Sequence, residues 1–130
     1  DIRMAGTLVY HPPCHDSLDG KGEELLRRMA PDGVVSTPHC CSEAGTLALS
    51  RPDIAAAMLD RKRAALAPHL AGAARPHRLL TNCPACLNGL GRQGLAPPAH
   101  LATALADAWG KENWRAWTFA QLARAELIRF

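Results

Sequence analysis

Hydrophobic and polar positions along the chain define three short β-prone runs, at residues 6–10, 33–37 and 77–81. Each run is rich in leucine, valine or threonine and is followed within a few residues by proline. Short apolar runs bounded by turn residues are typical of strands that are buried in a parallel sheet. We therefore predict three strands at these positions.

Helical spacing of apolar residues fills the intervals between the strands. Residues 23–29 predict a helix with Leu25, Leu26 and Met29 facing inward. Pro84 follows the third strand and is well placed to begin another helix, which glycines should close. The remaining predictions are a helix over residues 84–91, a glycine- and proline-rich linker over 91–98, and helices over 100–109 and 114–128.

The longest helix is predicted to begin at residues 50–53, where Ser50 and Asp53 form a capping-box pattern around an early proline. Proline inside a helix removes a hydrogen bond and clashes with the preceding turn, so Pro68 should end this helix. Its apolar positions recur about every 3.6 residues and should face the core. They are Ile54, Met58, Leu59 and Leu66.

Strands and helices thus alternate, which favours an α/β fold with a small parallel sheet of about three to four strands and flanking helices. We expect one domain over residues 1–130, with 99–130 as its C-terminal helical segment. The five cysteines follow the three predicted strands. Because the carboxyl ends of parallel strands share one edge, we expect the cysteines to meet there as a metal site.

Cysteine spacing supports a metal site. Cys83-x-x-Cys86 offers two sulfurs from one turn, a spacing common in zinc and iron–sulfur sites. Cys40 and Cys41 are adjacent, and neighbouring side chains of an extended segment point to opposite sides. Both can reach one centre only if the backbone there is irregular. Cys14 would complete the set.

Composition narrows the cellular setting. Five cysteines is an odd number, and no export signal or stretch of ~20 apolar residues is visible, so we expect a cytoplasmic protein without a transmembrane segment. The net charge is only +3 and its arginines are scattered, which gives no reason to expect nucleic-acid binding. The chain does not begin with Met, and we expect it to be a fragment of a longer oxidoreductase.

Three segments carry a family resemblance: residues 10–15, residues 40–46 and residues 81–86. Their sequences, YHPPCH, CCSEAGT and TNCPAC, resemble the cysteine-rich CCG domain. That domain occurs in heterodisulfide reductase and in the iron–sulfur subunits of glycolate and lactate oxidases. It also forms the C-terminal domain of large flavin-linked dehydrogenases of the D-lactate dehydrogenase type, and this chain resembles that group most. The resemblance covers residues 10–91 and, more loosely, 100–102.

The resemblance implies an α/β domain whose five motif cysteines hold a [4Fe-4S] cluster, of non-cubane type in heterodisulfide reductase. Carried over to this chain, the cofactor-binding residues would be Cys14, Cys40, Cys41, Cys83 and Cys86. The implied partner is a flavin-containing dehydrogenase domain or subunit that carries FAD. Disulfide reduction at the cluster is a variant that the resemblance to heterodisulfide reductase allows.

This sequence departs from the family pattern at two places. Ser42 stands where the glycine that gives the motif its name is expected. The segment between Cys14 and Cys40 is also short, with Gly20 and Gly22 inside it. Both departures bear on the type of cluster.

The residues also allow other interpretations. A structural zinc module would use four cysteines, or three with His15 or His39. A metal-free thiol–disulfide domain would use Cys83 as its nucleophile at a helix N-terminus. We favour the iron–sulfur interpretation because it uses all five cysteines. No glycine-rich nucleotide fingerprint follows a strand, so we expect a redox domain or subunit and not a complete enzyme.

Several polar residues lie near the cysteines in the sequence. The two histidines that flank the motifs, His15 and His39, are expected to hydrogen-bond a sulfur or to lie in turns, and His11 is a weaker candidate. Glu43 is expected to begin a helix more than to carry protons. The expected role of Asp16 and Asn82 is to accept hydrogen bonds from turn amides or to cap helices.

Overall fold

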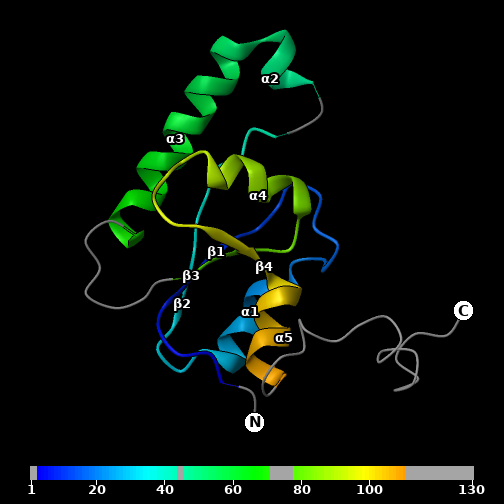
Figure 1. Ribbon diagram of the computed structural model, residues 1–130, viewed down its shortest axis with the longest axis vertical. Helices are drawn as coiled ribbons and strands as arrows, with labels where there is room; N and C mark the ends of the chain where they lie inside the picture. Colours follow the sequence, from blue (N-terminus) through cyan, green and yellow to red (C-terminus); the bar gives the residue numbers. More distant parts are fainter. Residues whose placement is uncertain (1–2, 44–45, 71–77, 111–130) are drawn as a thin grey trace, which may run out of the picture.

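The computed structural model describes residues 3–43, 46–70 and 78–110. A four-stranded parallel sheet, ordered β2-β1-β3-β4, lies at its centre (Figure 1). Its strands are β1 (Leu8–His11), β2 (Val34–Ser36), β3 (Arg78–Thr81) and β4 (Pro98–His100). The predicted α/β class and small parallel sheet are confirmed. The predicted helix over 114–128 lies outside the described residues.

Five helices connect or flank the strands of the described part of the chain. They are α1 (Lys21–Met29), α2 (Leu47–Ser50), α3 (Pro52–Leu70), α4 (Pro84–Gly91) and α5 (Leu101–Trp109). Within the described residues, no helix is long and apolar enough to cross a membrane.

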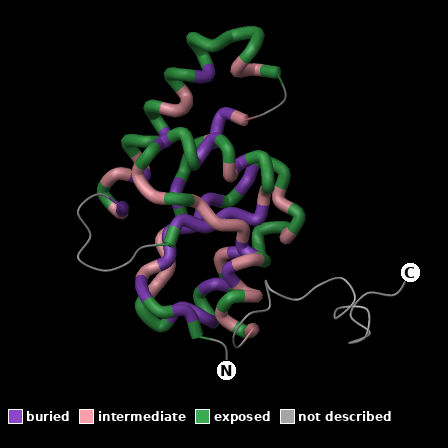
Figure 2. Tube along the Cα trace, in the orientation of Figure 1, coloured by how far each residue is buried: buried purple, intermediate pink, exposed green. Residues whose placement is uncertain are grey.

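Two hydrophobic clusters cover the two faces of the sheet. On one face, Leu8 and Tyr10 of β1 pack with residues of α1 and α5. On the other face, Val9 and Leu79 pack with α3, α4 and two of the cysteines. The central strands are therefore buried on both sides (Figure 2), as their apolar runs indicate. The cysteine-bearing face is the one under α3 and α4.

The predicted linker over 91–98 was wrong at its end, because Pro98 begins β4. Among the strands of the described residues, β4 pairs with β3 alone and forms one edge of the sheet. Proline lacks an N–H group, and it is tolerated at the first residue of an edge strand. A sequence pattern dominated by glycine and proline hides such a strand.

The predicted inward face of α3 is confirmed only in part, because Leu66 is 0% exposed but Met58 and Leu59 are half-buried. Ile54 is 39% exposed, and the buried stripe is instead formed by positions of the same helix at seven- and four-residue spacing. These positions are Ala55, Lys62, Leu66 and Leu70. On α1, Leu26 and Met29 are buried as predicted, but Leu25 is 37% exposed.

The two ends of α3 differ from the prediction as well. The helix continues through Pro68 to Leu70, so the proline does not end it. The Ser50 hydroxyl donates to the carbonyl of Thr46, and Asp53 pairs with Arg51. The predicted capping box is therefore replaced by contacts within α2 and the α2–α3 junction.

Candidate metal centre

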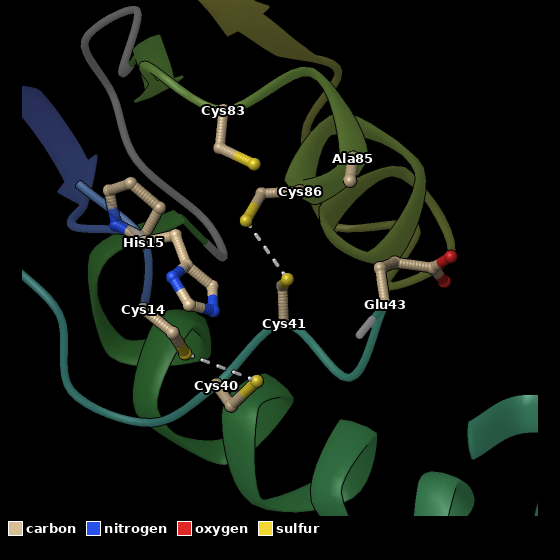
Figure 3. A pocket seen from close by; sticks show the side chains of 9 residues that line it. Cys14, His15, Cys40, Cys41, Glu43, Cys83, Ala85 and Cys86 are labelled. Atoms are coloured by element: carbon tan, nitrogen blue, oxygen red, sulfur yellow. Dashed lines mark hydrogen bonds between the residues drawn. The ribbon is translucent and has the colours of Figure 1, made fainter. Parts of the chain in front are cut away.

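The three cysteine segments meet at the carboxyl edge of the sheet. Cys14 follows β1, Cys40 and Cys41 follow β2, and Cys83 follows β3 and caps α4. All five cysteines line one cavity of about 230 Å³, with side chains from the three segments turned toward one another (Figure 3). The other lining residues are Pro13, His15, Glu43 and Ala85.

The sulfurs of this cavity form two close pairs. Cys41 Sγ and Cys86 Sγ are 3.0 Å apart and buried, and Cys14 Sγ and Cys40 Sγ are 3.6 Å apart near the surface. All five cysteines are free thiols. Two ligands of one tetrahedral ion lie roughly 3.5–4 Å apart when metal–sulfur bonds are about 2.3 Å long. The Cys14–Cys40 separation falls in this range, and the Cys41–Cys86 pair would have to open by roughly 0.5–1 Å to bind one ion.

An irregular backbone turns both adjacent cysteines into the cavity, as the Cys40-Cys41 pair required. His39 has φ 71° and Ser42 has φ 66°, both in the left-handed region. Glycine adopts this region freely, whereas other residues do so at a cost of roughly 1 kcal/mol. Ser42 stabilises it by donating its hydroxyl to Ala55 O and its N–H to Cys40 Sγ.

Helix α4 lies directly against the Cys41 segment. A Cβ at Gly89 would be 2.1 Å from the carbonyl oxygen of Cys41, so only glycine allows this approach. Glu43 also reaches the end of α4, where its carboxylate pairs at 2.6 Å with Arg92, the residue that follows the helix. Glu43 therefore lines the cavity as part of an ion pair, and it does not lie in the helix that begins at Leu47.

The two buried thiols, Cys41 and Cys86, have pKa values shifted in opposite directions. The hydrogen bond with Cys86, and next the neighbouring imidazole of His11, hold the pKa of Cys41 below its usual range. The same bond and burial raise the pKa of Cys86. Of the two thiols, Cys41 is thus favoured as the thiolate.

A buried lysine supports the Cys40-Cys41 segment from α3, and the sequence pattern did not predict it. Lys62 is fully buried, and its Nζ donates to Thr37 O at 3.2 Å, Thr37 Oγ1 at 2.8 Å and Pro38 O at 2.8 Å. Burial lowers its pKa to about 8, while the nearby cysteine thiolates act in the opposite direction. The signal that could have found it was its place in the 55-62-66-70 stripe.

A polar chain fixes the two segments that follow β1 and β3. Tyr10 donates its hydroxyl to Asn82 Oδ1 at 2.8 Å, and Asn82 Nδ2 donates to Asp16 Oδ1 at 2.6 Å. Asp16 also accepts from the N–H groups of Leu18 and Gly20, as expected of a turn residue. These hydrogen bonds fix the residues beside Cys14 and Cys83 in position relative to each other.

The buried phenol of Tyr10 gives the fold a dependence on alkaline pH. Burial, then Asp16 and Glu23, raise its pKa to about 12. Because the folded state holds this proton more tightly than the unfolded chain, stability should fall as pH rises from about 10 to 12, by about 2–3 kcal/mol. Tyr10 is the only tyrosine. Its phenolate absorption should therefore titrate late in the folded protein, and Tyr10→Phe should remove that part of the stability loss.

The histidines lie in three different environments. His15 is exposed and lines the cavity, which agrees with a place beside the sulfurs, whereas exposed His39 does not line it. His11, the weakest candidate from the sequence, is 1% exposed and lies with Cys41 and Cys86. Strand alternation from the buried residue Val9 was the signal that places His11 on this face.

Comparison with known proteins gives one similarity. The chain is 30% identical over 117 residues to the glycolate oxidase iron-sulfur subunit of Escherichia coli (strain K12). The match takes in 85% of this chain and 28% of that protein, so the chain spans less than a third of the relative's length. No family model matches the chain, and no solved structure matches it at a significant level. The similarity supports an iron–sulfur, cysteine-rich family and no finer assignment.

Proposed function

We propose that this chain is the iron–sulfur cluster-binding domain of an oxidoreductase, and that it is a redox part of a longer protein. The observation that carries the proposal is the convergence of five free cysteines from three strand ends on one cavity. Soft thiolate ligands select iron–sulfur clusters, zinc or copper(I). The similarity to an iron-sulfur subunit supports iron among these.

The five cysteines that line the cavity would hold the cluster, which we propose to be of the [4Fe-4S] type. A cubane cluster takes four thiolates, so a fifth allows a non-cubane cluster or an exchange of ligands. Such a group supplies one-electron transfer. The chain buries Cys41 and Cys86 and leaves Cys14 exposed, so the exposed side is where a redox partner would approach.

The proposed partner is a flavin-containing dehydrogenase domain or subunit that carries FAD. Electrons would pass from its flavin to the cluster and then to an acceptor. Support comes from the resemblance of the cysteine motifs to the CCG domain. Ser42 has a left-handed backbone at the position where the family has glycine, the residue that adopts this conformation most freely, and this agreement supports the resemblance.

A structural zinc site is the second candidate. His11, Cys41 and Cys86 offer ligand atoms that all lie within 4.8 Å of one another and are all buried. Zinc prefers this mixture of nitrogen and sulfur ligands in closed tetrahedral sites. A zinc centre would stabilise the fold without passing electrons.

Replacing Cys41 or Cys83 by serine tests the shared site. We expect either variant, rebuilt with iron and sulfide without oxygen, to lose most of the visible absorption, because a hydroxyl is a poor ligand for iron in such clusters. Ala85→Ser is the matched control, since it adds a hydroxyl to the cavity wall and removes no sulfur. Wild-type iron content in both cysteine variants would refute a site shared by the three segments.

A further inference from the structure

His11 is a buried histidine that lies beside Cys41 and Cys86, the two buried cysteines of the site. It ends β1, it is 1% exposed, and neither of its ring nitrogens makes a hydrogen bond of good geometry, although the imidazole lies close enough to Cys41 to lower the pKa of that thiol. A buried polar group without a partner costs roughly 1–3 kcal/mol. Native proteins rarely retain such a group unless water, an ion or a catalytic role explains it.

The strand itself directs His11 toward the cysteines. Residues two apart on a strand share a face, so His11 points the same way as Val9 and away from Tyr10. Val9 packs in the cluster that contains Cys41 and Cys86. The ligand atoms of His11 and these two cysteines all lie within 4.8 Å of one another. An imidazole and two sulfurs thus converge in the interior, without the exposed Cys14.

We propose that His11 is a metal-binding residue of this centre, giving one ring nitrogen to the metal that Cys41 and Cys86 also bind. His11 does not line the cavity itself, so the inference rests on the proposed function only in requiring a metal that Cys41 and Cys86 bind. The metal-binding residues would then form two groups. One group is buried and combines the His11 nitrogen with the sulfurs of Cys41 and Cys86. The other group is more exposed and has sulfur ligands alone, from Cys14, Cys40 and Cys83. On iron, His11 in place of one of the five thiolates would raise the reduction potential of the centre, because neutral imidazole replaces an anionic ligand.

Cobalt(II) is the probe metal for this proposal, because thiolate and imidazole ligation leave separate signatures. We would titrate the metal-free protein with cobalt and record the thiolate charge-transfer band. Electron–nuclear double resonance on protein with nitrogen-15 in its histidines would then detect a ring nitrogen bound to cobalt. This second measurement, made on the wild-type chain, shows whether any histidine binds cobalt even if a variant fails to fold; the variants then assign the nitrogen to one histidine.

His11→Leu keeps the buried volume but removes the nitrogen. Without metal it should be as stable as the wild type or more stable, because an unpartnered buried imidazole is removed. With cobalt it should bind at least ~10-fold more weakly and lose the nitrogen coupling. His39→Gln is the control, because His39 is exposed and does not line the cavity, and it should keep wild-type affinity and coupling. His15→Gln, at an exposed residue that does line the cavity, tests the competing ligand and should keep the nitrogen coupling.

The outcomes separate the two proposals. A thiolate band without nitrogen coupling, or with His11→Leu affinity equal to wild type, would overturn the role of His11 and leave the cysteine centre standing. Loss of coupling in His15→Gln and not in His11→Leu would assign the nitrogen to His15 and also overturn it. The absence of any thiolate band in the wild type would reject both the metal centre and the role of His11.

Discussion

Gly89→Ala should disable the centre without touching a cysteine. The added methyl group would lie 2.1 Å from the carbonyl oxygen of Cys41 and 2.8 Å from Cγ of Glu43. Backbone and helix must move apart, which we expect to cost about 2–3 kcal/mol of unfolding free energy or more. Cys41 would move away from Cys86, and metal bound per chain should fall at least ~10-fold, as for the loss of a supporting contact.

Gly91→Ala provides the matched control on the same helix. Its added methyl group would meet only Pro98, at 3.9 Å, which is an ordinary contact. Alanine favours a helix over glycine, so this variant should be as stable as the wild type or up to about 1 kcal/mol more stable. Metal content and denaturant unfolding would be measured on both variants. Equal behaviour of the two would contradict the close packing of α4 on the Cys41 segment.

Lys62→Met should loosen the segment that presents Cys40 and Cys41. Methionine fills a similar volume but leaves the carbonyl groups of Thr37 and Pro38 without the donor that they have now. The loss of partners for buried carbonyl groups should lower the unfolding free energy by about 1–3 kcal/mol. A positive charge near the thiolates also disappears, so the reduction potential of a bound cluster should fall.

The neighbouring Arg61 gives the control for this change. Arg61 lies on α3 but is exposed, so Arg61→Met should leave both stability and potential close to wild-type values. Urea unfolding of the metal-free chains and a redox titration of the rebuilt protein would be compared. A normal potential in Lys62→Met, despite reduced stability, would limit the lysine to a structural role.

Sequence alone predicted the part of the architecture that local patterns specify. The apolar runs of β1, β2 and β3 and the proline that begins α4 were sufficient to bring the cysteine segments to one sheet edge. The type of metal and the bond partners of each cysteine do not follow from such patterns. They depend on distances between segments that are far apart in the chain.

The missed features have a shared physical cause. Lys62 and His11 are polar residues in buried positions, and hydrophobicity patterns assign polar residues to the surface. Their burial depends on the tertiary surroundings: Lys62 donates to carbonyl groups of the segment after β2, and His11 lies beside two sulfurs. The close approach at Gly89 is likewise a property of packing, because a glycine inside a helix has no local signature of contact.

The most direct test of the central claim is analysis of iron, zinc and acid-labile sulfide, with an absorption spectrum, on protein purified without oxygen. We predict about four irons with matching sulfide per chain and a brown colour, as a [4Fe-4S] cluster requires. One zinc per chain with neither sulfide nor colour, persisting after an attempt to rebuild the cluster, would contradict the account and leave a structural zinc domain.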